Sequence, residues 1–570
     1  MDAGKRTIND IFNGNRILEI PFFQRAYVWG ENQWERLLED MELVTFSQKP
    51  YFLGSVILKQ QQTTSGNGVG DIRTLIDGQQ RLTTLNIFFK VLCLKTDKNS
   101  SFERRFKLEN EELALWHNHN DIESFERILH LEKLEEIDEK DGITRAYNFF
   151  KEKVNPEKLD WQTILNNIMF VGIDLGVEED EQQIFDTINS LGVRLTTAEL
   201  LKNYFFSRNE SDYYNKFWKN IFEKDDETKN YWDREITTGR VKRTFIDLFF
   251  YSYLQIKIQE LELKVRTEDK VEYSKVETLF DSYKNFIKNY GLSKIDILTE
   301  IKEYALLFKE NFDYEIVESE LTDEYGIERI NAIIFGLDTS TLIPYVLFVL
   351  KNVVDNNQKQ NLFEFLESYV MRRMVVHATT KNYNQLFTDR FISNKILTKQ
   401  QLQDYINLRS DKVNYLPTDE ELKAGFDNAI LVNKQSAGII YFIESKIRNR
   451  SRQATQLLGI NKYSLEHLMP KKWENNWELL ENKEERDFRN RKLLTLGNLA
   501  IITQSLNASI RDADWETKKK GKANKAGLSH YAGGIETLAP YLEIDIWNEL
   551  EIEKRADLLY RKSIEIWKLE

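Results

Sequence analysis

The chain has 570 residues, of which 41% are hydrophobic and 12% aromatic, so it has enough apolar surface for several packed domains. Its formal net charge of −13 argues against a protein that coats nucleic acid uniformly. No apolar run reaches the roughly eighteen residues of a membrane span, and the first residues contain no apolar signal core. The single cysteine, Cys93, excludes disulfides within the chain and cysteine-based zinc sites. We therefore expect a cytoplasmic, multidomain protein without a membrane partner, with Cys93 in its core.

The first part of the chain mixes helical and strand patterns. Residues 32–44 have apolar side chains at helical spacing, whereas residues 51–60 and 71–77 are short, rich in β-formers and separated by the turn-forming TTSGNGVG. This pattern predicts a hairpin that leads into a helix. A further strand is predicted over residues 168–176, ahead of the helix-like EDEQQIFDTINSLG. Residues 1–212 are therefore predicted to form an α+β domain.

The remainder of the chain is predicted to be mainly helical. Residues 213–416 contain long amphipathic segments with few glycines or prolines, which is typical of a helical domain. Residues 417–570 begin with another helical piece, and from Ser464 onward a short apolar strand, a loop and a second strand follow. The predicted fold class is α+β, multidomain and mostly helical.

Three polar clusters in the first domain adjoin predicted strand or helix edges. In DGQQR, Gly78 allows a close approach of the backbone, the following helix start offers free N–H groups, and Arg81 supplies a planar cation, which together suit a phosphate. Asp77 is suited to hold a divalent ion or orient water, and Gln79 and Gln80 to donate to phosphate or base edges. A polar turn capped by Asp77 explains the same residues without a ligand. The clusters are IPFFQRAYVW (20–29), LIDGQQRLTTL (75–85) and FDTINSLGVRLTTAELLKN (185–203).

These motifs, in this order and with FLGSVIL between the first two, resemble the amino-terminal domain of the GmrSD-type, modification-dependent (type IV) restriction nucleases. That domain is similar to the ParB and sulfiredoxin fold, and its DGQQR motif is associated with binding and hydrolysing a nucleoside triphosphate. The resemblance therefore implies a site for GTP, UTP, ATP or CTP, with Asp77 catalytic. The absence of a GxxxxGK[ST] motif disfavours a Walker-type ATPase. The residues implied for the nucleotide site are Gln24, Arg25, Asp77, Gly78, Gln79, Gln80, Arg81, Asn189 and Lys202.

A second group of polar residues lies in YSLEHLMPKKW and in the following TLGNLAIITQSLNASI. Hydrolysis of a phosphodiester needs a base to activate water, a group that fixes the tautomer of that base, and a divalent ion. His467 lies at a predicted strand end beside Glu466, Asn498 begins a second strand, and Asn507 lies nine positions further on. A lone histidine with its hydrogen bonds satisfied at a strand edge is the non-catalytic alternative for His467.

This arrangement resembles the His-Me finger, or HNH, nucleases, which build a ββα unit around one metal ion. EHLMP and LGNLAII resemble specifically the carboxy-terminal nuclease domain of the GmrSD family. The resemblance implies that His467 is the general base, that Asn498 orients its imidazole, and that Glu466 and Asn507 hold Mg²⁺, Mn²⁺ or another divalent cation. The chain departs from many HNH proteins in having no zinc-binding cysteines, and in having Asn507 where the motif name has its last histidine.

Two basic runs flank this second candidate site. Residues 446–472 carry seven lysines or arginines and one acid, and residues 518–525 carry five lysines and no acid. Each run alone is typical of a solvated surface, but two runs around one site favour a groove for a phosphate backbone. The residues expected to contact DNA are Lys471, Lys472, Lys518, Lys519 and Lys520.

Two other features have structural interpretations that are at least as good as functional ones. Arg372 and Arg373 resemble an arginine pair of the same family, and a buried structural salt link explains them equally well. Trp473 and Trp477 could stack on a base, although tryptophans more often fill a core.

Taken together, the sequence predicts a nucleotide-regulated, metal-dependent DNA endonuclease of bacterial antiphage defence that cuts or nicks modified double-stranded phage DNA. Two other classes remain open, a nucleotide-sensing DNA-binding module without nuclease activity and an NTPase that docks on nucleic acid. The sequence does not predict which modification is recognised, whether the nucleotide activates or inhibits, or whether the chain forms a homodimer.

Overall fold

The structure, a computed structural model, divides the chain into two compact units, Met1–Lys216 and Phe217–Glu570. The predicted boundary near residue 416 falls inside the second unit, and the division into three domains, 1–212, 213–416 and 417–570, stays a prediction. None of the described helices is long and apolar enough to span a bilayer. The residues that the structure describes are 2–13, 16–21, 24, 26–61, 71–176, 196–206, 210–238, 241–407, 413–448, 456–522, 525–532 and 534–570.

A six-stranded mixed sheet, in the order β1-β6-β3-β4-β2-β5, organises the first unit. The predicted hairpin is confirmed as the antiparallel pair β3–β4, and the predicted strand at 168–176 is confirmed as β6, which runs parallel to β3 and antiparallel to β1. The strands are β1 Asp2–Thr7, β2 Ile17–Glu19, β3 Tyr51–Gln60, β4 Ile72–Asp77, β5 Leu115–Trp116 and β6 Ile168–Leu175.

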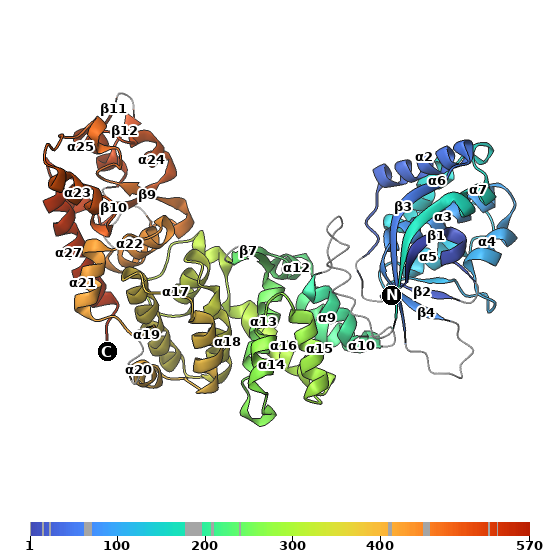
Figure 1. Cartoon of the computed structure of the whole chain (residues 1–570), viewed down its shortest axis with the longest axis horizontal. Coiled ribbons are helices and arrows are strands. Elements are labelled where there is room, and N and C mark those ends of the chain that lie inside the picture. The colour runs from blue at the N-terminus through green and yellow to red at the C-terminus, as the bar shows by residue number, and fades with distance from the viewer. Residues whose placement is uncertain are drawn as a thin grey trace. The chain divides into compact units, whose positions relative to one another are not determined.

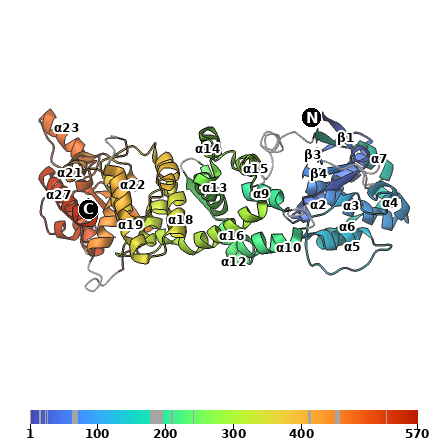
Figure 2. The ribbon, with the colours of Figure 1, turned by 90° about the horizontal axis from the view of Figure 1, so that it is seen from below.

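Helix α3 is the central helix of this unit. Every residue from Leu82 to Cys93 is buried, and α3 packs against α4, α5 and α6, as two views show (Figures 1 and 2). The predicted burial of Cys93 is confirmed. The helices are α1 Ile8–Ile11, α2 Glu31–Ser47, α3 Gln79–Lys95, α4 Asn99–Phe106, α5 Ile122–Leu129, α6 Gly142–Lys153, α7 Trp161–Asn167, α9 Thr197–Phe205 and α10 Ser211–Tyr214. The helix-like segment predicted at 179–192 lies outside the described residues.

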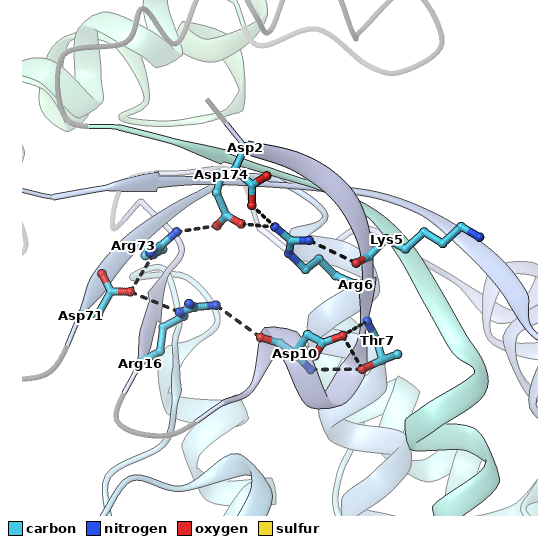
Figure 3. A network of polar contacts seen from close by, with 9 residues as sticks. All are labelled: Asp2, Lys5, Arg6, Thr7, Asp10, Arg16, Asp71, Arg73 and Asp174. Atoms are coloured by element: carbon cyan, nitrogen blue, oxygen red, sulfur yellow. Dashed lines mark hydrogen bonds and ion pairs between the residues drawn. The ribbon is translucent and has the colours of Figure 1, made fainter.

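A network of arginines and aspartates ties the strands of this sheet together (Figure 3). Arg73 on β4 donates to Asp174 on β6 at 2.5 Å and to Asp71 at 2.8 Å. Arg6 on β1 donates to Asp174 at 3.3 Å, and Arg16, just ahead of β2, donates to Asp71 at 3.3 Å. Because these guanidinium groups are paired with carboxylates of the same unit, the network stabilises the sheet and does not present free cations to a ligand.

The second unit is mainly helical, as predicted. One difference is a hairpin of β7 Glu235–Thr238 and β8 Val241–Thr244, whose β-branched residues interrupt the helical pattern. The helices are α11 Asn220–Phe222, α12 Asp226–Trp232, α13 Phe245–Lys257, α14 Thr267–Tyr273, α15 Leu279–Asn289, α16 Lys294–Asn311, α17 Ile327–Asn331, α18 Ile343–Asn352, α19 Asn356–Val375, α20 Lys399–Asn407, α21 Asp419–Asn428, α22 Asn433–Ile447, α23 Lys483–Lys492, α24 Gln504–Ile510, α25 Trp515–Lys520, α26 Leu528–Tyr531 and α27 Glu549–Ile566.

Near the carboxyl end, two strands and a helix form a ββα element. β9 (Tyr463–His467) pairs antiparallel with β10 (Leu499–Thr503), and α24 follows β10 directly, which confirms the predicted strand, loop and second strand. Helix α22 packs on both strands, and α24 packs on them as well (Figure 1). A second, short ladder joins β11 (Gly521–Lys522) to β12 (Lys525–Ala526). The predicted α+β, mostly helical and multidomain class is therefore confirmed.

The arginine pair of α19 is structural. Arg372 is fully buried and donates to the carbonyl oxygens of Pro417 at 2.9 Å and Trp567 at 2.6 Å. Arg373 is also fully buried and donates to the carbonyl oxygen of Tyr415 at 2.9 Å. These bonds link α19 to the segment before α21 and to the end of α27, so the two arginines bind backbone within the second unit.

Candidate functional site

The segment from Asp77 to Arg81 spans the end of β4 and the first turn of α3. Gly78 has a φ of +102°, and a Cβ there would meet Val56 Cγ2 at 3.0 Å and the Ser55 carbonyl oxygen at 3.2 Å, so this turn requires glycine. Asp77 accepts a hydrogen bond from the Ser55 hydroxyl and another from Arg81 Nη2 at 3.0 Å. Arg81 Nη2 also donates to the Ser55 carbonyl oxygen at 2.7 Å.

Two buried polar atoms in this segment have no hydrogen-bond partner among the described residues. They are Oε1 of Gln79 and Nε of Arg81. Gly54, at a bulge of β3 with a φ of +132°, lies against the guanidinium group, since a Cβ there would meet Arg81 Cζ at 3.2 Å. A buried polar atom that stays unbonded costs about 1–3 kcal/mol. The DGQQR segment is therefore suited to receive polar groups of a ligand.

Hydrogen bonds join the described parts of the three amino-terminal motifs. Gln80 Oε1 accepts from the backbone N–H of Val28 at 2.9 Å and of Trp29 at 3.3 Å, so Gln80 holds the first motif to α3. Gln24 is buried, and its Oε1 accepts from Nδ2 of Asn203 on α9 at 3.2 Å. Asn203 is a residue that the sequence did not single out, although it closes the third motif, and its buried Oδ1 has no partner in the described part of the chain.

Three other residues are predicted to bind the nucleotide, and the structure describes one of them. Lys202 lies on α9 and is 8% exposed, next to Asn203 in the chain. Arg25 and Asn189 lie outside the described residues.

A buried polar network holds the first motif against α3. The Tyr27 N–H donates to Asp121 at 2.7 Å, and the Tyr27 hydroxyl pairs with the Thr84 hydroxyl at 2.6 Å. The indole of Trp34 donates to the same tyrosine oxygen at 2.7 Å, and Thr84 donates to the Gln80 carbonyl oxygen at 2.7 Å. These buried hydrogen bonds thus hold the DGQQR segment in place through the Gln80 backbone.

The neighbouring His117 makes the first unit sensitive to acid. Its Nδ1 accepts from the Asn118 N–H at 3.1 Å, so Nε2 carries the proton and donates to the Thr83 hydroxyl at 2.8 Å. Burial lowers the pKa of His117 from 6.5 to about 3. The pKa of His117 is lower in the folded state than in the unfolded state, so neutral His117 contributes to the free energy of unfolding. This contribution is complete above pH 6.5 and is lost as the pH falls toward 3. The free energy of unfolding then falls by up to about 1.4 kcal/mol per pH unit.

Hydrogen exchange of the α3 amides, measured between pH 7 and 4, tests this expectation. His117→Gln should flatten the pH dependence, and His130→Gln, at an exposed position, should leave it unchanged. An equal slope in wild type and His117→Gln would contradict the assignment.

In the second unit, β9 ends with Glu466 and His467. Side chains alternate along a strand, so Glu466 shares a face of the sheet with Ser464 and with Ala500, its partner on β10. Glu466 is 5% exposed, and its carboxylate pairs with the fully buried ammonium of Lys518 on α25. The same ammonium donates to the His467 carbonyl oxygen at 2.7 Å.

His467 has the protonation state that a general base requires. Its side chain is half-buried at the end of β9, and neither ring nitrogen has a hydrogen bond to a described residue. Burial lowers the pKa of His467 to about 4, with smaller contributions from the positive charges of Lys471 and Lys518. The imidazole is therefore neutral at neutral pH and can accept a proton.

Asn498 lies in the turn before β10 and is completely buried. Its Oδ1 accepts from the Met469 N–H at 2.9 Å and from the Trp547 indole at 3.0 Å. Its Nδ2 donates to the carbonyl oxygens of Met469 at 2.8 Å and Leu493 at 2.9 Å. The prediction that Asn498 orients the imidazole of His467 is wrong, because these four bonds use the whole amide. Asn498 instead fixes the backbone two residues after His467.

The turn that carries Asn498 is held in place by Arg555 of α27. Its Nη1 donates to the carbonyl oxygens of Gly497 at 2.9 Å and Leu499 at 2.6 Å. A Cβ at Gly497 would meet the Ile552 carbonyl oxygen at 2.2 Å, so α27 packs directly on this turn. The sequence did not predict a role for Arg555, because no motif connects it to Gly497 and Leu499, which lie much earlier in the chain.

Asn507 lies on α24 and leans back on β9. Its Nδ2 donates to the Ser464 hydroxyl at 3.0 Å and to the Leu465 carbonyl oxygen at 3.1 Å, whereas its Oδ1 accepts no hydrogen bond from the described residues. Since Ser464 shares its face of the strand with Glu466, the amide of Asn507 lies on the side of the sheet that carries this carboxylate.

Two family models match the chain. The model of the GmrSD restriction endonuclease N-terminal domain matches residues 8–206, and the model of the GmrSD restriction endonuclease C-terminal domain matches residues 416–562. Together they cover more than half of the 570 residues. The chain belongs to the GmrSD restriction endonuclease family. It is therefore a DNA endonuclease of phage defence, and both candidate sites lie within the matched segments. No curated protein matches the chain.

Two of the five lysines that we expected to contact DNA in this GmrSD endonuclease are inside the fold. Lys518 is fully buried and Lys519 is 7% exposed, so the prediction is wrong for both. Lys471 and Lys472 are exposed just after β9, and the Lys520 side chain is 76% exposed. These three remain candidates for phosphate contacts.

The tryptophans near the nuclease motif are engaged within the fold. Trp473 is 1% exposed, with the guanidinium of Arg489 over its ring at 4.6 Å and its indole donating to Asn490 at 2.9 Å. Trp477 is half-buried, and its indole donates to the Ala513 carbonyl oxygen at 3.3 Å. For Trp473, burial in the core is therefore the correct interpretation.

Glu466 and Asn507 are chemically suited to a hard divalent cation. Mg²⁺ is commonly bound through one or two carboxylates together with water and substrate oxygens. The two residues offer a carboxylate and an amide oxygen on one side of β9, and this amide oxygen accepts no hydrogen bond from the described residues. In the described part of the chain no group of three or more His, Cys, Asp or Glu residues could hold a metal. The donor set thus fits an ion that keeps most of its water rather than one enclosed by protein.

Proposed function

We propose that this chain is a nucleotide-regulated, metal-dependent endonuclease that cuts or nicks modified double-stranded phage DNA. The observation that carries the proposal is the half-buried imidazole of His467 at the end of β9, which has no hydrogen bond to a described residue. Burial lowers its pKa to about 4, and Glu466 and Asn507 of the same ββα element supply oxygen donors. A soluble cytoplasmic enzyme is part of the same proposal.

In the proposed mechanism, His467 removes a proton from water through a ring nitrogen. The hydroxide attacks phosphorus in line, the bond to the 3′ oxygen breaks, and that oxygen leaves with the electron pair. Glu466 and Asn507 would hold a divalent cation, which when bound would supply charge stabilisation at the departing oxygen. Asn498 and Arg555 keep the backbone after β9 and the turn before β10 in place, so that the base does not move during the reaction.

The first unit is proposed to bind and hydrolyse a nucleoside triphosphate. The N-terminus of α3 and Arg81 would meet the phosphates, and Asp77 would orient water or an ion. Gln79, Arg81 and Asn203 each have a buried polar atom without a hydrogen-bond partner among the described residues, which supports a polar ligand here. If nucleotide and DNA binding are coupled, DNA must change nucleotide affinity by the same factor as nucleotide changes DNA affinity.

Incubation of a supercoiled plasmid, and of modified and unmodified phage genomes, with Mg²⁺ and each nucleoside triphosphate tests this proposal. We expect cleavage that requires Mg²⁺, prefers modified DNA and changes with one nucleotide, and we expect Asp77→Ala to lose triphosphate hydrolysis. Triphosphate loss without cleavage would support an NTPase that docks on nucleic acid instead. Binding of DNA with neither activity would support a sensing module without nuclease activity.

A further inference from the structure

Lys518 is the one buried cation that the described structure places directly on the proposed nuclease strand. It is fully buried on α25, its ammonium pairs with Glu466, and it also donates to the His467 carbonyl oxygen at 2.7 Å. The next residue, Lys519, is almost as buried, but its ammonium donates to the Ile544 carbonyl oxygen at 2.8 Å, away from β9. Two neighbouring lysines of one helix thus have comparable burial and different partners.

The Lys518 ammonium affects how the Glu466 carboxylate can bind a cation. Glu466 and Lys518 are both shielded from water. Each neutralises the charge of the other, because either charge would be costly to bury alone. One carboxylate oxygen of Glu466, Oε1, is occupied by Lys518. A divalent cation at Glu466 would therefore share the carboxylate with a positive charge, and the repulsion between two cations is strong in a partly buried site.

We propose that Lys518 is a positioning residue that sets the cation affinity of the nuclease site. Its ammonium holds the Glu466 carboxylate and the His467 backbone in place, and its charge keeps cation binding weak in the free protein. The phosphate oxygens of DNA add negative charge and ligands, so full cation binding is tied to the presence of substrate. This inference rests on the proposed nuclease function and deepens it by naming how the cation site is regulated.

Mn²⁺ binding to the full chain without DNA, measured by electron paramagnetic resonance of the free ion, tests the proposal independently of cleavage. We expect Lys518→Gln to bind Mn²⁺ on the order of tenfold more tightly than wild type, because the competing charge is removed while the amide can still hydrogen bond. Lys519→Gln is the matched control and should bind Mn²⁺ like wild type. At saturating Mn²⁺, cleavage by Lys518→Gln should have a lower kcat, since the His467 backbone loses its charged donor.

The double variant Glu466→Gln Lys518→Gln, which lacks both buried charges, covers the case in which the single variant does not fold. It should bind Mn²⁺ no more tightly than Glu466→Gln alone, because Lys518 acts through Glu466. Tighter binding by the double variant, or wild-type Mn²⁺ affinity in folded Lys518→Gln, would overturn the inference. Failure of the proposed function is a different result, namely wild-type protein that binds Mn²⁺ and cleaves no DNA.

Discussion

Replacement of His467 by alanine is expected to lower the rate of DNA cleavage roughly 10²- to 10⁴-fold, the range that a positioned general base contributes. The neutral imidazole lies at the end of β9 and has the low pKa of about 4 that keeps it unprotonated at neutral pH. Its ring makes no hydrogen bond to a described residue, so its removal leaves no buried polar group unpaired. Single-turnover cleavage of a supercoiled plasmid in Mg²⁺ measures the effect.

A histidine outside the nuclease element provides the control. His377 follows α19, is exposed and has a φ of +54°, a conformation that asparagine tolerates. His377→Asn should cleave at the wild-type rate. Equal cleavage by wild type and folded His467→Ala, with contaminating nuclease excluded by chelator controls, would remove His467 from the mechanism.

Replacement of Asn498 by alanine is expected to lower the free energy of unfolding of the second unit by about 3 kcal/mol or more. The amide makes four buried hydrogen bonds, to Met469, Leu493 and Trp547, and each is worth about 1 kcal/mol. Alanine also leaves their partners unsatisfied at a completely buried position. Thermal and denaturant unfolding of the full chain, followed by hydrogen exchange of β9 and β10, measures the loss.

Asn490 is a matched asparagine for this comparison. It is exposed and accepts one hydrogen bond, from the Trp473 indole at 2.9 Å. Asn490→Ala should cost at most about 1 kcal/mol. If Asn498→Ala were no more destabilising than Asn490→Ala, the four bonds of Asn498 would not be the anchor of this turn.

The elements around both sites could be predicted from local patterns. The β3–β4 hairpin has β-rich runs on either side of a turn. β10 is a short apolar run that ends in Thr503, and its partner β9 is a short strand that ends in Glu466 and His467. DGQQR likewise follows a strand and starts a helix. These features depend on neighbours in the chain, which sequence patterns report directly.

The roles of individual polar residues could not be predicted in the same way. Three consecutive lysines on α25 look like a surface run, but successive helical residues point in different directions, so Lys518 and Lys519 face inward and Lys520 faces solvent. The partner of Lys518, Glu466, lies 52 residues earlier in the chain. The identity of such a partner is decided by tertiary packing and not by local composition.

Tertiary packing also explains why the predicted role of Asn498 is wrong. Its motif position suggests a catalytic neighbour, yet one of its partners is Trp547, which lies 49 residues later in the chain. Gln80 shows the effect in the first unit, because its side-chain oxygen bonds to backbone N–H groups that precede it by about fifty residues. Sequence patterns therefore place these residues beside the candidate sites but do not report what each one contacts.

The location of a divalent ion beside the DNA backbone is the most direct test of the central claim that the ββα element hydrolyses a phosphodiester. Crystals of His467→Ala with a duplex oligonucleotide and Mn²⁺, measured at the manganese absorption edge, give this location. We predict an anomalous peak about 2.1 Å from oxygens of Glu466 and Asn507, with a phosphate next to position 467. A peak remote from both residues, or DNA bound with no ion at this strand, would contradict the account.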